Sequence, residues 1–229
     1  MAKSKIIKEF VQSKVSVDVA LRQLKVLLSN FEKQSLMDWV NYELQGYPRD
    51  YEYLPDYREH HGVLKGSFLN FSVKATNVAI PLSNKMPGKM KEKFESVRFV
   101  QSISALYGML KKQEGEKVNF GMQIPSDMLS YIQQYSNISM TCLLSASIDI
   151  GETVLYDIIS SVENKVLDIL LLLEKEFGCL DDLDIDISDK NTADIENIQN
   201  NIYMIIYDNH IEIGDNNTIS KSTISVNDE

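Results

Sequence analysis

The chain is poor in the side chains that most often build disulfides, redox centres or metal sites. Its 229 residues include two cysteines, Cys142 and Cys179, and three histidines. No CxxC pair occurs, and two distant cysteines cannot make a disulfide framework, so we expect buried free thiols. His60 and His61 would point to opposite faces of a strand, and His210 stands alone. We therefore predict no metal site and no cofactor.

A long hydrophobic run is also missing. The most apolar stretch, residues 166–173, contains Asp168, whereas a membrane helix needs about 20 largely apolar residues. The basic N-terminus, MAKSKIIKEF, has no apolar stretch of signal-peptide length. Hydrophobic residues make up 44% of the chain and charged residues 24%, which is typical of a globular protein with a sizeable core. We expect a cytoplasmic protein that makes no membrane contact.

Positive charge is scarce only towards the C-terminus. The net charge is −10, and residues 1–180 contain 21 basic and 21 acidic side chains. Residues 181–229 contain Lys190 and Lys221 against twelve acidic residues, so the whole imbalance lies there. Phosphates would repel such a segment, which argues against a nucleic-acid-binding tail. We predict that residues 181–197 form a solvated acidic linker.

Two amphipathic helices are predicted near the N-terminus. Apolar residues recur three or four positions apart in two successive stripes, which comprise Leu21, Leu24, Leu28 and Phe31, then Leu36, Trp39, Val40 and Leu44. Gly46 follows the second stripe where a left-handed C-cap would end the helix, and Pro48 prevents its continuation. These features predict a helical hairpin.

The middle of the chain has strand-like features, and a long helix follows. Residues 57–82 contain β-branched clusters divided by glycine and asparagine, which indicates two or three short strands. Helical spacing returns over 86–112, and strands are predicted at 118–125 and 138–150. A long apolar stripe predicts a helix over 152–177, which Gly178 would end. The predicted class is α+β, with the N-terminal hairpin and the long C-terminal helix packed around a small, mainly antiparallel sheet within residues 1–180.

The C-terminal segment, residues 198–229, is predicted to be a β-strand tail that pairs either with the sheet of its own chain or with other copies, and a tail too short to be stable alone favours pairing between copies. Residues 202–207 carry no charge and have high strand propensity, and an unpaired apolar strand is prone to associate. We therefore predict a homo-oligomer. The candidate oligomerisation residues are Ile202, Met204, Ile206, Ile211, Ile213, Ile219 and Ile224.

The segment 35–62 is unusually aromatic and contains the only tryptophan. Trp39 lies on a helical apolar stripe and is predicted to be a core residue. Tyrosine and arginine are enriched at protein-recognition surfaces, although loops that cover a sheet use them as well. The partner-binding candidates are Arg49, Tyr51, Tyr53, Tyr57 and Arg58.

Four segments in order, 20–48, 55–66, 78–84 and 161–178, resemble the AbiTii domain of bacterial abortive-infection proteins. The signature W-x-x-x-E-L-x-G-Y matches Trp39, Glu43, Leu44, Gly46 and Tyr47, and the following P-x-Y-R matches Pro55, Tyr57 and Arg58. The resemblance covers about residues 4–178. It implies a role in anti-phage defence, and it implies no catalytic residues.

Three functional hypotheses remain at this point. The first is a non-enzymatic assembly, adaptor or sensor component whose partner comes from the same defence locus or from the phage. The second is a toxin enzyme that acts on nucleic acid or a nucleotide through the 49–61 loop, with Arg49, Arg58, Glu59 and His60 as candidate residues. The third is an antitoxin-like regulatory subunit whose acidic tail masks a basic partner.

Overall fold

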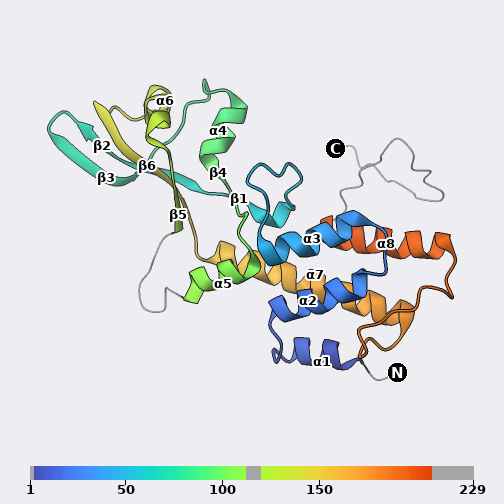
Figure 1. Cartoon of the computed structure of the whole chain (residues 1–229). Coiled ribbons are helices and arrows are strands. Elements are labelled where there is room, and N and C mark those ends of the chain that lie inside the picture. Colours follow the sequence, from blue (N-terminus) through green and yellow to red (C-terminus); the bar gives the residue numbers. More distant parts are fainter. Residues whose placement is uncertain (1–2, 112–119, 208–229) are drawn as a thin grey trace, which may run out of the picture.

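The computed structural model describes residues 3–111 and 120–207 and confirms the α+β class (Figure 1). The helices are α1 (Lys5–Val11), α2 (Val17–Leu28), α3 (Gln34–Gln45), η1 (Asp56–Arg58), α4 (Gly88–Glu95), α5 (Ile103–Lys111), η2 (Ser126–Met128), α6 (Leu129–Tyr135), α7 (Thr153–Phe177) and α8 (Thr192–Tyr207). The strands are β1 (Glu59–His61), β2 (Val63–Asn70), β3 (Val73–Ala79), β4 (Ser96–Arg98), β5 (Phe120–Gln123) and β6 (Cys142–Ile150).

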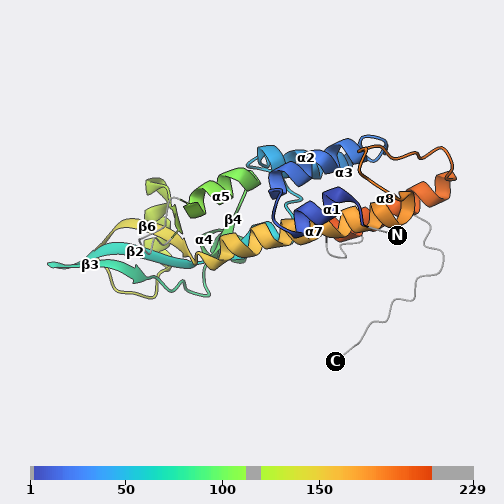
Figure 2. The same cartoon turned by 90° about the horizontal axis from the view of Figure 1, so that it is seen from below.

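Helix α7 is the long central element of a helical bundle. It contacts α1, α2, α5 and α8, and it runs below α2 and α3 in Figure 2. Its predicted apolar stripe is buried along its whole length: Leu155, Ile158, Ile159, Val162, Val166, Ile169, Leu170 and Leu173. The prediction of this helix is confirmed, and Gly178 ends it with a positive φ of 86°.

The N-terminal hairpin is confirmed as α2 and α3, which pack against each other. Gly46 follows α3 with a φ of 97°, in the left-handed region that favours glycine. A Cβ atom at this position would lie 2.9 Å from the carbonyl oxygen of Val100. Gly46 therefore ends the helix and also lets the chain approach the segment before α5.

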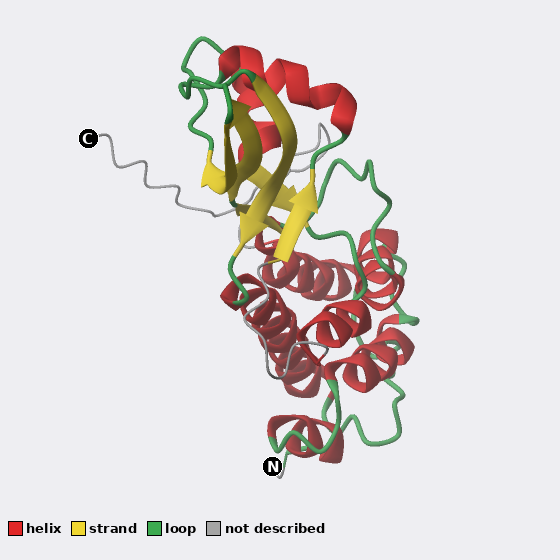
Figure 3. Cartoon of the chain, turned by 90° about the vertical axis from the view of Figure 1, so that its left-hand side faces the viewer, coloured by secondary structure: helices red, strands yellow, loops and turns green. Residues whose placement is uncertain are grey.

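The antiparallel sheet has the strand order β3-β2-β6-β5. Helices α4 and α6 pack near it, and it stands beside the helical bundle (Figure 3). In β6, Ser145 pairs with Ser67 and Leu143 pairs with Phe68, so the register shifts at Leu144. This irregularity exchanges the two faces of the strand, which is why Leu143 is buried and Leu144 is exposed, opposite to strict alternation.

The spatial arrangement and one helix differ from the sequence prediction. Helices from both halves of the chain pack on one another, and the sheet lies to one side of them instead of at their centre (Figure 1). The helix predicted over 86–112 is interrupted, because β4 pairs antiparallel with β1 between α4 and α5. Val97 and Phe99 are buried there. Pairing with β1 and burial of these side chains therefore favour an extended segment over a continuous helix.

Helix α8 corrects the predictions of an acidic linker over 181–197 and a strand over 202–207. Its buried residues, Ile198, Ile202 and Ile206, are four positions apart, and they pack where α8 contacts α3 and α7. Met204, predicted to share their surface, is 41% exposed. The buried Lys165 of α7 donates from Nζ to the Ile205 carbonyl oxygen (2.8 Å), close to the helix C-terminus. Burial of a helical stripe thus overrides local strand propensity.

The segment before α8 is also packed, since Leu180 and Ile185 are buried and Asn30 Nδ2 donates to the Ile185 carbonyl oxygen (2.9 Å). The remaining oligomerisation candidates, Ile211, Ile213, Ile219 and Ile224, lie outside the described residues, and their role stays a prediction.

Both cysteines are free, but they are exposed, so the expectation of buried thiols was wrong. Cys142 begins β6 on the face that the register shift leaves exposed. Among residues 3–111 and 120–207, no helix combines the length and the apolar composition that crossing a membrane requires.

Candidate functional site

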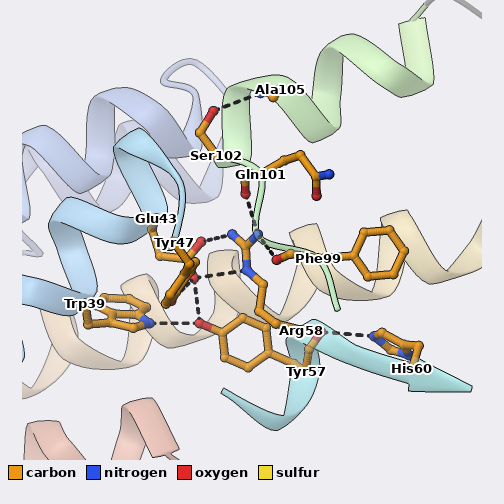
Figure 4. Close-up of polar contacts among 10 residues, drawn as sticks. All are labelled: Trp39, Glu43, Tyr47, Tyr57, Arg58, His60, Phe99, Gln101, Ser102 and Ala105. Carbon is orange, nitrogen blue, oxygen red and sulfur yellow. Dashed lines mark hydrogen bonds and ion pairs between the residues drawn. The ribbon is translucent and has the colours of Figure 1, made fainter. Parts of the chain in front are cut away.

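A buried ion pair lies at the centre of the family signature. The side chains of Glu43, from α3, and Arg58, from η1, are both 0% exposed, and Arg58 Nη2 donates to Glu43 Oε2 (Figure 4). Arg58 Nε also donates to Glu43 Oε1 at 3.3 Å. Burial alone would lower the pKa of Arg58, but attraction to Glu43 and the hydrogen bonds between them raise it. The Arg58 guanidinium therefore remains charged inside the protein.

Three aromatic side chains complete this network. The Tyr47 and Tyr57 hydroxyls donate to Glu43 Oε1 at 2.7 and 2.8 Å, and Trp39 Nε1 donates to the Tyr57 hydroxyl at 2.8 Å. Burial and the charge of Glu43 raise the pKa of both tyrosines well above its ordinary value, so both phenols remain protonated. Trp39 is a core residue, as predicted.

The network also joins separate elements of the fold. Arg58 Nη1 donates to the carbonyl oxygens of Phe99 (3.1 Å) and Gln101 (2.6 Å), on the connection between β4 and α5. The Tyr47 backbone N–H donates to the Val100 carbonyl oxygen at 2.7 Å. Arg58 thus bonds to α3 and to this connection at once, and removing one member of the ion pair would leave a buried charge without its partner.

These contacts change the role expected of two predicted partner-binding residues, Tyr57 and Arg58. Arg58 has no exposed surface, and Tyr57 is largely covered with its hydroxyl bonded inside the network. Arg58 cannot contact a partner without opening the network, whereas part of the Tyr57 surface is accessible, so its role in partner binding stays a prediction. His60, a candidate of the enzyme hypothesis, is half-buried, and its Nε2 lies 3.0 Å from the Tyr57 carbonyl oxygen.

The other tyrosine candidates lie at the surface and line a pocket of about 340 Å³. Tyr51 and Tyr53 come from the loop after α3, while Tyr203 and Tyr207 come from the last turns of α8. The remaining lining residues are Ser35, Glu52, Leu54, Pro55 and Asp56. Arg49 is exposed but is not among the lining residues. The structure therefore brings two predicted residues together with two residues that the sequence analysis missed.

The tyrosines form continuous ring contacts on both sides of the pocket. The Tyr51 and Tyr53 ring centroids are 6.3 Å apart in an edge-to-face arrangement, and those of Tyr203 and Tyr207 are 4.6 Å apart. Tyr51 also packs against Tyr42 at 4.9 Å. Burial and the neighbouring phenols Tyr51 and Tyr203 raise the pKa of Tyr207. The Tyr207 phenol therefore stays protonated in the pocket. Tyr203 and Tyr207 are four positions apart, and this spacing predicts neighbouring rings only if the segment is helical.

A larger cavity of about 750 Å³ lies between the α1–α2 connection, α5 and α7. Two pairs of its polar side chains are bonded to each other: Tyr107 donates to Glu163 Oε1 at 2.6 Å, and Ser104 donates to Asp18 Oδ1 at 3.0 Å. Partial burial and the hydrogen bond to Glu163 raise the pKa of Tyr107, so its phenol stays protonated. Within the described part of the chain, no group of three or more His, Cys, Asp and Glu side chains could hold a metal ion.

The match to known families agrees with the signature that builds the network. The AbiTii family model matches residues 4–201, which extends past the predicted limit at about residue 178 and into α8. No curated protein and no solved structure matches the chain. Since the family model covers most of the sequence, the chain belongs to the AbiTii family.

Proposed function

We propose that the chain is a non-enzymatic sensor or adaptor of abortive-infection defence against phage, and that it recognises a protein partner through the tyrosine pocket. Membership of the AbiTii family indicates the defence role in general terms. The specific role is inferred from which aromatic and charged side chains are exposed and which are buried among the described residues. The partner would be a protein of the same defence locus or a phage component.

One observation carries this proposal: four tyrosines from two distant parts of the chain converge on one surface pocket. Tyr53 is 60% exposed, although burying an aromatic ring of this size is strongly favourable. Tyrosine supplies a large, rigid contact area with one polar end, which is why it is enriched where proteins recognise one another. The pocket therefore has the composition of a recognition site.

The buried network supports a recognition role over the enzyme hypothesis. Arg58, the basic residue that a toxin site in the 49–61 loop would need most, is enclosed and bonded to Glu43 and to two backbone carbonyls. A substrate phosphate could reach it only by breaking that network. If an enzyme nevertheless uses this loop, His60→Ala would abolish toxicity in a protein that still folds.

The proposal is tested by phage plating on cells that carry the gene with its native neighbours. Tyr53→Ala should abolish protection, because it removes an exposed ring of the pocket while leaving the buried core intact. Tyr156→Ala is the matched control, since Tyr156 is 54% exposed on α7 and does not line the pocket. Both variants should accumulate to the level of the unmodified protein.

Full protection by Tyr53→Ala would overturn the proposed use of the pocket. Protection by the gene without its neighbours would instead favour a chain that contains its own effector. An adjacent gene for a basic, toxic protein would favour the antitoxin-like hypothesis, in which the acidic C-terminal residues mask that protein.

A further inference from the structure

We propose that the tyrosine pocket binds an arginine side chain of the protein partner. This inference rests on the proposed function and names the chemistry that the partner must present. It combines the four aromatic rings, the sign of the charges that line the pocket, and the pocket's size.

The aromatic rings favour a cationic occupant. The face of a tyrosine ring carries partial negative charge and attracts ammonium and guanidinium groups. The chain itself contains such a contact at one of these rings, because Lys33 Nζ, which does not line the pocket, lies 4.7 Å from the centroid of the Tyr203 ring. Tyr203 therefore already accepts a cation within its own chain. Tyr51, Tyr53 and Tyr207 supply further rings of the same kind.

The charged lining residues have a single sign. Glu52 and Asp56 are the charged side chains among the residues that line the pocket, and both are exposed. They would attract a cation and repel a phosphate or a carboxylate, so an anionic ligand is disfavoured. The acidic lining therefore adds to the preference that the tyrosine rings create.

The shape of the guanidinium group selects arginine over lysine. Its planar surface can stack on a tyrosine ring while its N–H groups at the edge donate to a carboxylate such as that of Glu52. A lysine ammonium can also lie over a ring and donate a hydrogen bond, as Lys33 does with Tyr203 and Asn200, but it is compact and strongly hydrated and has no flat surface that stacks on a ring. The apolar walls formed by Leu54 and Pro55, both buried, suit the methylene stem of the same side chain.

The size of the pocket is consistent with one side chain. At about 340 Å³, it lies at the lower end of the range for small-ligand sites, about 300–1,000 Å³. It can admit an extended side chain of a partner protein but not a folded element.

The test is calorimetric titration of the full-length chain with three capped tripeptides, acetyl-Gly-Xaa-Gly-amide, in which Xaa is arginine, citrulline or lysine. Citrulline keeps the shape of arginine and removes its charge. The arginine peptide should bind at least about tenfold more tightly than the citrulline peptide, because it alone makes cation–π contacts and charge-assisted hydrogen bonds. It should also bind more tightly than the lysine peptide.

Two variants connect the binding to this pocket. Tyr53→Ala and Glu52→Gln should each weaken arginine binding several-fold, and Glu52→Gln is an exposed, isosteric change that leaves the fold intact. Tyr156→Ala should bind as the unmodified chain does. Equal binding of arginine and citrulline, equal binding of arginine and lysine, no binding, or unchanged binding by both pocket variants would each overturn the inference.

The outcome separates this inference from the proposed function. If Tyr53→Ala abolishes phage protection but the chain shows no preference for arginine, the pocket is a recognition site of different specificity, and only the inference fails. If arginine binds selectively but protection survives in Tyr53→Ala, the proposed function fails and the binding site stands.

Discussion

At the scale of single residues, Glu43 and Arg58 are the most consequential pair, because each neutralises a charge that water cannot reach. We expect Glu43→Gln to lower the free energy of unfolding by about 3 kcal/mol or more, since it leaves the Arg58 guanidinium buried without its counter-charge. Urea denaturation would measure this loss. Both side chains are 0% exposed, so solvent cannot compensate for it.

Glu52→Gln is the matched control for that variant, because it makes the same chemical change on an exposed side chain. Its effect should stay within about 0.5 kcal/mol. If Glu43→Gln were equally harmless, the network would not be the stabilising element that its geometry indicates. Combining Glu43→Gln with Arg58→Met should restore part of the lost stability, because the unpaired charge is then removed as well.

A second residue, Glu174, makes stability depend on pH. It accepts hydrogen bonds from Lys3 Nζ (2.6 Å), Ser4 N (2.5 Å) and Ser4 Oγ (2.7 Å), which join the start of the chain to α7. Partial burial alone would raise the pKa of Glu174, but these hydrogen bonds lower it from its ordinary 4.5 to about 2.

Because the pKa of Glu174 is lower in the folded state, its contribution to stability is present above pH 4.5 and is lost as the pH falls towards 2. Thermal melts should therefore show a decline in this interval that is smaller in Glu174→Gln. The variant itself should be less stable at neutral pH. Identical acid profiles for both proteins would exclude Glu174 as a cause of the decline.

At the scale of elements, the pattern of buried side chains in α8 fits a helix and not a strand. Ile202 is 0% exposed and Met204 is 41% exposed, whereas a strand would place both on one face. Ile202→Ala should lower the free energy of unfolding by about 2–5 kcal/mol, because it leaves a cavity between α8 and its neighbours. Met204→Ala should have a much smaller effect. Chemical denaturation of the two variants would measure both.

Equal losses in Ile202→Ala and Met204→Ala would contradict the helical packing of α8 and favour the strand. The comparison needs no assumption about residues beyond Tyr207, because both positions lie in the described part of the chain.

At the scale of the whole molecule, the predicted self-association now depends on a shorter segment. Ile202 and Ile206 are buried within their own chain, and Met204 is an exposed candidate that lies on a helix, so Ile211, Ile213, Ile219 and Ile224 remain as candidates for strand pairing between copies. If they join copies by strand pairing, the full chain will be oligomeric in light scattering, and a chain that ends at Tyr207 will be monomeric. A full-length chain that is a homogeneous monomer would contradict this prediction.

The sequence alone was most informative where structure follows from a local repeat. The stripes over α2, α3 and α7 predicted those helices, and Gly46 and Gly178 predicted where two of them end. A 3.6-residue repeat and a left-handed cap depend on neighbours within a few residues, so no knowledge of distant contacts was needed. The signature from Trp39 to Arg58 indicated the family, and five of its residues, Trp39, Glu43, Tyr47, Tyr57 and Arg58, form one compact network.

Only the tertiary structure decided which polar and aromatic side chains are accessible. Arg58 and Tyr53 are close in sequence and of similar predicted role, yet Arg58 is enclosed by Glu43 and the segment before α5, while Tyr53 is exposed beside α8. Residues 202–207 carry a strand-like composition, but packing on α3 and α7 makes them helical. Burial is set by segments distant in the chain, and local propensities of a few tenths of a kcal/mol per residue cannot outweigh it.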